Sequence, residues 1–153
     1  MTVPPPRALK QRVQDSLERF EQDVDAWVAT ASADDDVPYL IPLSFLWTDG
    51  TLLLATAASA PAGRNLLAGG KVRLGIGQTR DVVLVEGLAE SIPAAELDDA
   101  TGDAFAVKTG FDPRTLSTPY FYFRVRPQRV LAWREENELR DRVIMRDGQW
   151  RTD

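Results

Sequence analysis

The chain contains no cysteine and no histidine. Without cysteine it forms no disulfide, offers no thiolate to a metal and has no thiol nucleophile. Without histidine it lacks the commonest general base, a common metal ligand and the usual Ser-His-Asp triad. We therefore expect no metal site. Few conventional catalysts remain, which favours chemistry carried by a bound redox cofactor.

Long apolar runs and an excess of positive charge are also missing. No stretch approaches the ~20 apolar residues of a membrane span, and the N-terminus has no apolar signal segment. The net charge is -5, so the chain as a whole does not suit a nucleic-acid backbone. We therefore expect a cytoplasmic protein with no membrane or nucleic-acid partner. Arginine outnumbers lysine 15 to 3, which is typical of a GC-rich bacterial gene.

The 153 residues fit one domain. Residues 1–7 contain three consecutive prolines and predict a disordered or loosely docked arm, followed by a single domain over residues 8–153. Ala8 to Asp23 predicts a helix that packs across an end of the core, because apolar residues recur on one face. These residues are Leu9, Val13, Leu17 and Phe20.

A hairpin in the first third of the chain organises the predicted fold. Val37 to Trp47 alternates between two largely apolar faces, and Thr51 to Ala57 returns as its partner strand. Asp49-Gly50 between them favours a tight primed turn. Because one apolar face lines a core, the other has to meet a second layer, a partner subunit or a ligand.

Small residues follow the hairpin. The run from Ala58 to Gly63 leads into a predicted short helix over Arg64 to Gly69, whose exposed N–H groups suit an anion. Lys71 to Gln78 reads as a strand in which Gly75 and Gly77 share a face. We interpret them as a barrel bend in preference to room for a flat ring or a neighbouring backbone.

The second half predicts further strands and one long helix. Pro127 marks a bulge or edge in the strand that contains it. Six or so antiparallel strands with short turns indicate a small mainly β barrel with short helices. The predicted strands are Ala26–Ser32, Val82–Ile92 with a bulge at Gly87, Pro119–Val125 and Gln128–Trp133, the helix is Pro93–Thr109, and Met145 to Trp150 closes the chain with another Asp-Gly turn.

The stretch from Val37 to Glu90, with KTGFDPR at Lys108 to Arg114 and RPQRVLAWREENEL near the end, resembles the FMN-binding split-barrel superfamily. The likeness spans roughly residues 25–150. It is strongest to pyridoxamine 5'-phosphate oxidase-like proteins, and within them to the branch that uses the deazaflavin coenzyme F-420. The resemblance implies an antiparallel Greek-key-type split barrel, a homodimer and an oxidoreductase that transfers hydride between F-420 or FMN and a small organic substrate.

The resemblance also implies a site in a groove between two subunits. The cofactor phosphate would lie by residues 56–65, the ring along Leu43, Ser44 and Phe45, and the partner subunit would contribute near Trp133 and Arg134. Arg64 is the best single candidate, because a guanidinium can hold phosphate oxygens with two parallel hydrogen bonds. No catalytic residue stands out. The cofactor-binding candidates are Leu43, Ser44, Phe45, Thr56, Ser59, Arg64, Asn65, Trp133 and Arg134.

Two departures from the family pattern keep an alternative open. Ala60 and Ala62 stand where the branch commonly has a hydroxyl and another hydroxyl or a basic residue. The alternative is therefore a non-catalytic cofactor carrier, or a dimeric module with a degenerate pocket. A haem-binding relative is disfavoured by the missing histidine. Pyridoxamine-phosphate oxidation itself is disfavoured for the same reason.

FMN and F-420 remain rival cofactors. The F-420 tail requires a basic groove, and the candidates for it are Arg73, Arg80, Arg124 and Arg126.

Overall fold

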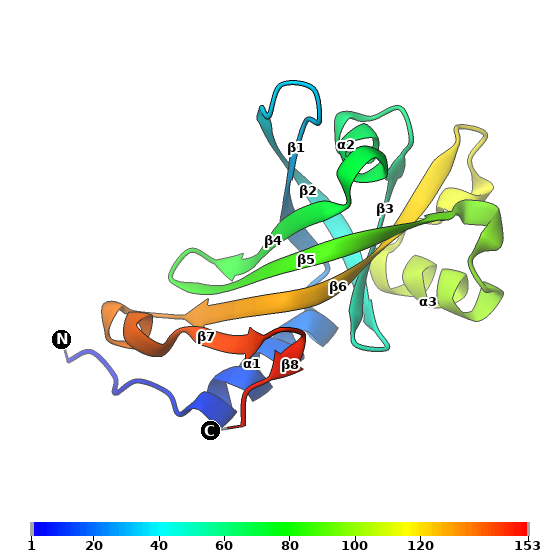
Figure 1. Ribbon diagram of the computed structural model, residues 1–153. Helices are drawn as coiled ribbons and strands as arrows, with labels where there is room; N and C mark the ends of the chain where they lie inside the picture. Colours follow the sequence, from blue (N-terminus) through cyan, green and yellow to red (C-terminus); the bar gives the residue numbers. More distant parts are fainter. Residues whose placement is uncertain (1, 153) are drawn as a thin grey trace.

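The computed structural model of the chain describes residues 2–152 and shows a closed antiparallel barrel of six strands (Figure 1). Their order is β3-β2-β1-β4-β5-β6, and β6 closes the barrel by pairing with β3. The run β4-β1-β2-β3 is a Greek-key order, so the predicted mainly β split-barrel class is confirmed. The strands are β1 (Asp25–Ala31), β2 (Pro38–Thr48), β3 (Thr51–Ala57), β4 (Lys71–Gln78), β5 (Asp81–Pro93) and β6 (Tyr120–Trp133).

Three helices surround the barrel. Helix α1 (Leu9–Gln22) and helix α2 (Pro61–Gly69) each insert apolar side chains into the barrel core, and in Figure 1 they lie at its lower and upper ends. Helix α3 (Asp99–Thr109) packs outside the barrel against β2. Among the described residues, none of the helices has the length and apolar character to cross a membrane. The shorter elements are η1 (Ala94–Glu96), η2 (Pro113–Thr115), η3 (Glu136–Asp141), β7 (Val143–Arg146) and β8 (Gln149–Trp150).

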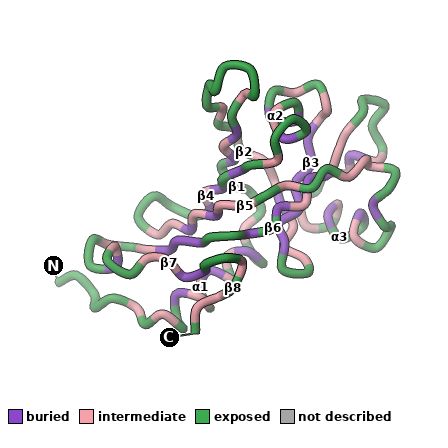
Figure 2. Tube along the Cα trace, viewed as in Figure 1, coloured by how far each residue is buried: buried purple, intermediate pink, exposed green. Residues whose placement is uncertain are grey.

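The buried residues form two layers, seen as purple along the strands in Figure 2. The barrel interior holds Phe20 of α1, Phe45 of β2 and Leu54 of β3. Outside β3, Leu53 packs in a second cluster with Phe105 of α3. Strand β3 is therefore buried on both faces, which explains its unbroken apolar sequence.

Several predictions of local structure are confirmed. Asp49 and Gly50 both have positive φ, as a primed hairpin turn requires. A register shift at Glu86/Gly87 opposite Pro127 is the predicted bulge, although β6 continues unbroken through the proline. Gly77 has φ +91°, and a Cβ there would lie 2.1 Å from a guanidinium nitrogen of Arg19. The glycine therefore leaves room for the Arg19 side chain and for the Asp81 carbonyl oxygen, which would lie 2.6 Å from a Cβ, while β4 pairs with β5 without a register shift and the barrel bend stays a prediction.

Two helix predictions were wrong. Helix α2 begins at Pro61, three residues before the predicted start, because proline at the first helical position has no N–H to leave unpaired. The predicted helix over Pro93 to Thr109 is broken into η1 and α3. The break occurs at Asp98, whose carboxylate accepts the Thr101 N–H at 3.0 Å and caps α3.

Candidate functional site

A pocket of about 380 Å³ opens on the outer side of β2 and β3, and we call it the β2–β3 pocket. It unites three predicted site residues, because β2 and β3 form a hairpin and pair next to each other. Helix α3 and the loop after it form the opposite wall, where the Phe111 and Tyr120 rings lie 5.6 Å apart. Its lining residues are Asp25, Pro42, Leu43, Ser44, Ala55, Thr56, Phe105, Phe111 and Tyr120.

The polar groups of this pocket are few. Ser44 Oγ donates a hydrogen bond to Asp25 Oδ1 at 2.6 Å across the β1–β2 pair. Thr56 is buried at the end of β3, and its backbone pairs with Phe121. The pocket is therefore lined by three residues with a hydroxyl, Ser44, Thr56 and Tyr120, and by one carboxylate beside aromatic walls, which suits a flat ring with polar edges.

The start of α2 follows directly after Thr56. Ala60 is the N-cap and makes no side-chain hydrogen bond, and Pro61 has no N–H, so the first turn keeps unpaired backbone donors. Arg64 is exposed and its Nη1 donates to the Ser59 carbonyl oxygen. The guanidinium therefore lies back along the 59–64 turn, with its other N–H groups available to an anion.

Two further candidates face away from the pocket. The Phe45 side chain is fully buried in the barrel interior, so only its backbone borders the ring position predicted along β2. Asn65 Nδ2 donates to Thr30 Oγ1 at 3.0 Å, which turns the amide toward β1. Of the predicted phosphate-binding residues, Ser59 and Arg64 lie at the exposed turn and Asn65 does not.

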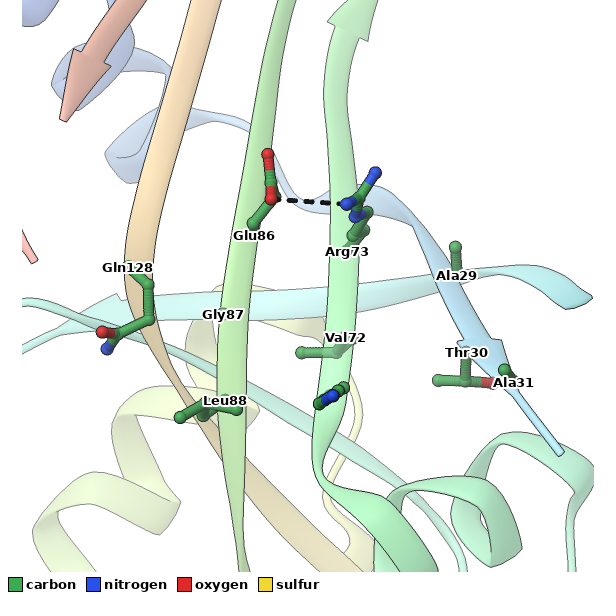
Figure 3. A pocket seen from close by; sticks show the side chains of 10 residues that line it. Ala29, Thr30, Ala31, Val72, Arg73, Glu86, Gly87, Leu88 and Gln128 are labelled. Atoms are coloured by element: carbon green, nitrogen blue, oxygen red, sulfur yellow. Dashed lines mark hydrogen bonds and ion pairs between the residues drawn. The ribbon is translucent and has the colours of Figure 1, made fainter. Parts of the chain in front are cut away.

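A second concave region covers the outside of β1, β4, β5 and β6, and we call it the outer groove. It consists of two adjoining cavities of about 450 and 480 Å³ that share Ala29, Arg73 and Glu86. Figure 3 shows the first cavity, with Glu86 reaching Arg73 across neighbouring strands at 3.4 Å. Trp27 and Leu40, at 54% and 62% exposed, line the second cavity. The outer groove is thus an exposed apolar surface with an ion cluster at its centre, in which Glu86 pairs with both Arg73 and Arg129.

Trp133 and Arg134 lie far from the β2–β3 pocket within one chain. Phe121 of β6 pairs with Thr56, whereas Trp133 pairs with Val82 at the other end of the same strand. Twelve strand residues correspond to about 40 Å along β6. The structure therefore brings together Leu43, Ser44 and Thr56. Trp133 and Arg134 lie away from them, at the other end of β6 in the same chain.

Two residues near these sites were not among the predicted set. The Arg142 guanidinium carbon lies 5.6 Å from the centre of the Trp133 ring, a cation–π contact. Lys108 Nζ lies 4.7 Å from the Phe45 ring centre and donates to the Phe45 carbonyl at 3.3 Å. Burial lowers the pKa of Lys108, and Asp23 and Glu21 partly oppose this effect. The position of Lys108 on the last turn of a predicted helix was the one signal available in the sequence.

The arginines considered for a basic groove do not gather in one chain. Arg73 pairs with Glu86, Arg80 with Glu135 at 3.7 Å and Arg126 with Glu90 at 3.6 Å. Arg124 lines a separate cavity that also contains Glu90 and Asp98. Carboxylates therefore accompany all four positions, and none of them lines the β2–β3 pocket.

Solved structures with the same fold share little sequence with this chain. An F420 reductase has 20% identity and a TM-score of 0.60, over 74% of this chain and 93% of that one. A FAD-binding protein from Mesorhizobium loti has 20% identity and a TM-score of 0.61, over 77% and 89%. General Stress Protein 26 from Bacillus anthracis has 17% identity and a TM-score of 0.57, over 82% and 96%. No curated protein sequence matches this chain.

The model of the pyridoxamine 5'-phosphate oxidase family matches residues 13–134. This span begins within α1, contains the whole six-stranded barrel and ends just after Trp133. Together with the Greek-key barrel, the match confirms the resemblance seen in the sequence. The chain therefore belongs to the pyridoxamine 5'-phosphate oxidase-like split-barrel family.

Proposed function

We propose that the protein is a homodimeric oxidoreductase that binds FMN or F-420 at the β2–β3 pocket and transfers hydride to or from a small organic substrate. The observation that carries the proposal is the pocket itself, which Ser44 and Thr56 line in a member of this family, with the start of α2 following shortly after Thr56 in the chain. An F420 reductase and a FAD-binding protein share the fold.

The residues present suit the ring and one phosphate of such a cofactor. The exposed Arg64 guanidinium, in the first turn of α2, is the donor for a phosphate, whereas Ala62 and Gly63 beside it are buried. Phe111 and Tyr120 offer aromatic faces beside the hydroxyls of Ser44 and Thr56. When bound, a flavin or deazaflavin supplies the hydride chemistry, and the chain binds it, orients it and excludes water. Proton transfer is left to solvent or to a tyrosine, with Asp25 and Tyr120 the ionisable side chains among the residues that line the pocket.

The anionic tail of F-420 is the harder part to accommodate. Asp25 places a carboxylate in the pocket, and the arginines outside it are paired with glutamates. One chain therefore supports the short tail of FMN better than a longer polyanionic tail. Binding of F-420 requires cations from a second subunit.

The outer groove supports the homodimer. Trp27 and Leu40 leave a large apolar surface beside the polar Arg73–Glu86 pair, a composition suited to a subunit interface. Because Trp133 and Arg134 lie about 40 Å along β6 from the pocket of their own chain, we infer that they complete the pocket of the partner subunit.

A titration of the apo-protein with FMN and with F-420, followed by tryptophan fluorescence, tests this function. We expect a Kd of about 1–10 µM for at least one of them. Arg64→Met should raise that Kd by about tenfold or more, because it removes a charge-assisted contact to phosphate. Arg146→Met, an exposed arginine on β7, is the matched control and should leave the Kd unchanged. Absence of binding below about 100 µM would overturn the proposal.

The alternative is a non-catalytic member with a degenerate pocket. Two candidate hydrogen-bond donors for the cofactor already have partners within the chain, which favours this alternative. The Ser44 hydroxyl donates to Asp25, and the Arg64 guanidinium donates to the Ser59 carbonyl. Ala60 lacks a hydroxyl, and Ala62 is only 1% exposed and faces the protein interior. A folded dimer that binds neither cofactor in the titration would establish this alternative.

A further inference from the structure

The segment before α1 is attached to the segment after β6 by a buried ion cluster. Glu138 of η3 is only 3% exposed, and its carboxylate accepts hydrogen bonds from the Arg7 guanidinium at 2.9 and 3.0 Å. Arg12 of α1 lies 3.8 Å from the same carboxylate. We call this cluster, Arg7, Arg12 and Glu138, the arm clamp. A buried carboxylate requires such partners, so the arm and η3 stabilise each other.

The arm clamp fixes both ends of the segment from Arg134 to Asp141. At the first end, the Arg134 backbone N–H donates to Glu138 Oε1 at 2.9 Å. At the second end, Arg12 Nη1 donates to the Asp141 carbonyl at 2.6 Å. In addition, Asn137 Nδ2 donates to the Pro4 carbonyl at 2.8 Å. The 3₁₀ helix between these ends has weak hydrogen bonds of its own, so contacts from the arm and α1 determine its position.

The Arg134 side chain is aligned by the same region. Its Nε lies 3.2 Å from Asp81 Oδ1, and its Nη2 lies 3.6 Å from Asp15 Oδ2. Asp15 also pairs with Arg7 Nη1 at 3.0 Å, and Arg19 pairs with Asp81 at 2.8 Å. Arg134 is 45% exposed despite these contacts, so its guanidinium is held at the surface in one orientation.

We propose that Arg7 and Glu138 are positioning residues for cofactor binding, because they hold the Trp133–Arg142 segment in the orientation that it presents to the partner subunit. This inference rests on the proposed function. A segment ordered before binding loses less conformational entropy when the cofactor arrives, and the affinity is correspondingly higher. Neither Arg7 nor Glu138 lines the β2–β3 pocket of its own chain.

Amide hydrogen exchange of the apo-protein tests the arm clamp without any cofactor. Arg7→Met should speed exchange in residues 134–142 by about tenfold or more, with the barrel strands unchanged. Arg7→Lys keeps the charge but loses the forked geometry, and it should give a smaller increase. Lys10→Met, an exposed cation on α1 outside the cluster, is the control and should match the wild type. Unchanged exchange in Arg7→Met would overturn the clamp.

Cofactor binding tests the positioning role. In Arg7→Met we expect a Kd for FMN or F-420 raised by about tenfold, and slow exchange in residues 134–142 restored at saturating cofactor. A general loss of stability would instead speed exchange in the barrel strands of the apo-protein as well. Faster exchange with an unchanged Kd would overturn the positioning role. Wild-type protein that binds neither cofactor would overturn the proposed function and the positioning role with it, whereas the exchange data would still support or refute the clamp itself.

Discussion

At the scale of the residue, Gly63 stands where the first turn of α2 crosses the end of β3. A Cβ at this position would lie 2.1 Å from the Ala57 carbonyl oxygen, which is backbone and cannot move aside cheaply. Gly63→Ala should therefore lower the free energy of unfolding by about 1–3 kcal/mol. Gly69→Ala, in the last turn with nothing within 4 Å, is the matched control and should change it by less than ~1 kcal/mol. Equal stability of the two variants by urea denaturation would show that α2 does not approach β3 this closely.

Tyr122 is a second residue whose environment makes a specific prediction. Its side chain is fully buried, and among residues 2–152 its hydroxyl has no hydrogen-bond partner. Burial raises the pKa of this phenol, so it stays neutral at physiological pH. Tyr122→Phe should therefore leave the unfolding free energy unchanged or raise it by up to ~1 kcal/mol. A loss of more than ~1 kcal/mol on thermal denaturation would show that the hydroxyl is satisfied after all, for example by a buried water.

At the scale of the element, the cap of α3 decides where that helix begins. Asp98 Oδ2 accepts from both the backbone N–H and the hydroxyl of Thr101, at 3.0 and 2.8 Å. Asp98→Ala should lower the unfolding free energy by about 1 kcal/mol. Asp99→Ala removes a first-turn charge but no cap, and should cost about 0.5 kcal/mol or less. A larger loss in Asp99→Ala, measured by chemical denaturation, would contradict the assigned cap.

The arm clamp also makes stability depend on pH. Burial alone would raise the pKa of Glu138, but the hydrogen bonds and charge of Arg7 hold the pKa below its ordinary range. The stabilisation is therefore complete above the unfolded pKa of about 4.3 and is lost as pH falls through the lower folded pKa. Asp15, which faces Arg7 and Arg134, has its pKa lowered in the same direction.

A pH series on the wild type and Glu138→Gln isolates this effect. The difference in unfolding free energy between them should be constant above about pH 5 and should shrink below about pH 4. Asp15 is present in both chains, so only the part of its titration that is coupled to Glu138 through Arg7 enters the difference. A difference that persists unchanged at pH 3 would contradict the assigned role of the Glu138 carboxylate.

Most helices and strands of the fold could be predicted from the local sequence. The two helices that were predicted with wrong bounds differ for physical reasons. The Asp49-Gly50 turn and β3 were predicted at their observed bounds. The turn residues and the apolar run that follows them both indicate that a strand begins at Thr51. The start of α2 was missed because the small residues before Arg64 carry no clear helix signal. Only the structure shows that Pro61 occupies the first position of the helix. The break before α3 was missed because an aspartate inside a helical stretch does not by itself reveal that its carboxylate caps a new helix, as that of Asp98 does.

At the scale of the whole molecule, three of the nine residues that line the β2–β3 pocket were candidates from the sequence. Leu43, Ser44 and Thr56 meet because they lie on one hairpin, which local pattern can identify. The separation of Trp133 from Thr56 depends on the length of β6 and on how the barrel closes, which no local pattern contains. The arm clamp joins residues more than 120 positions apart in the sequence. A local sequence pattern therefore could not predict it.

The outer groove makes a prediction about assembly. Leu40→Arg places a charge in the proposed interface and should convert the dimer to the 17.0 kDa monomer in multi-angle light scattering. Leu40 is 62% exposed in one chain, so the substitution should not unfold it. Val107→Arg, on an 86% exposed position of α3, is the control and should remain a dimer. If light scattering shows the wild-type protein to be a monomer at micromolar concentration, the proposed interface is contradicted.

The central claim is that one subunit supplies the β2–β3 pocket and the other supplies Trp133. Mixing two defective chains, Arg64→Met and Trp133→Leu, tests it most directly, by cofactor titration after the subunits have exchanged. If the site is shared, each mixed dimer contains one intact site, and binding returns with the wild-type Kd at about a quarter of the wild-type capacity. If each chain binds cofactor alone, no mixture restores binding, and the shared site is contradicted.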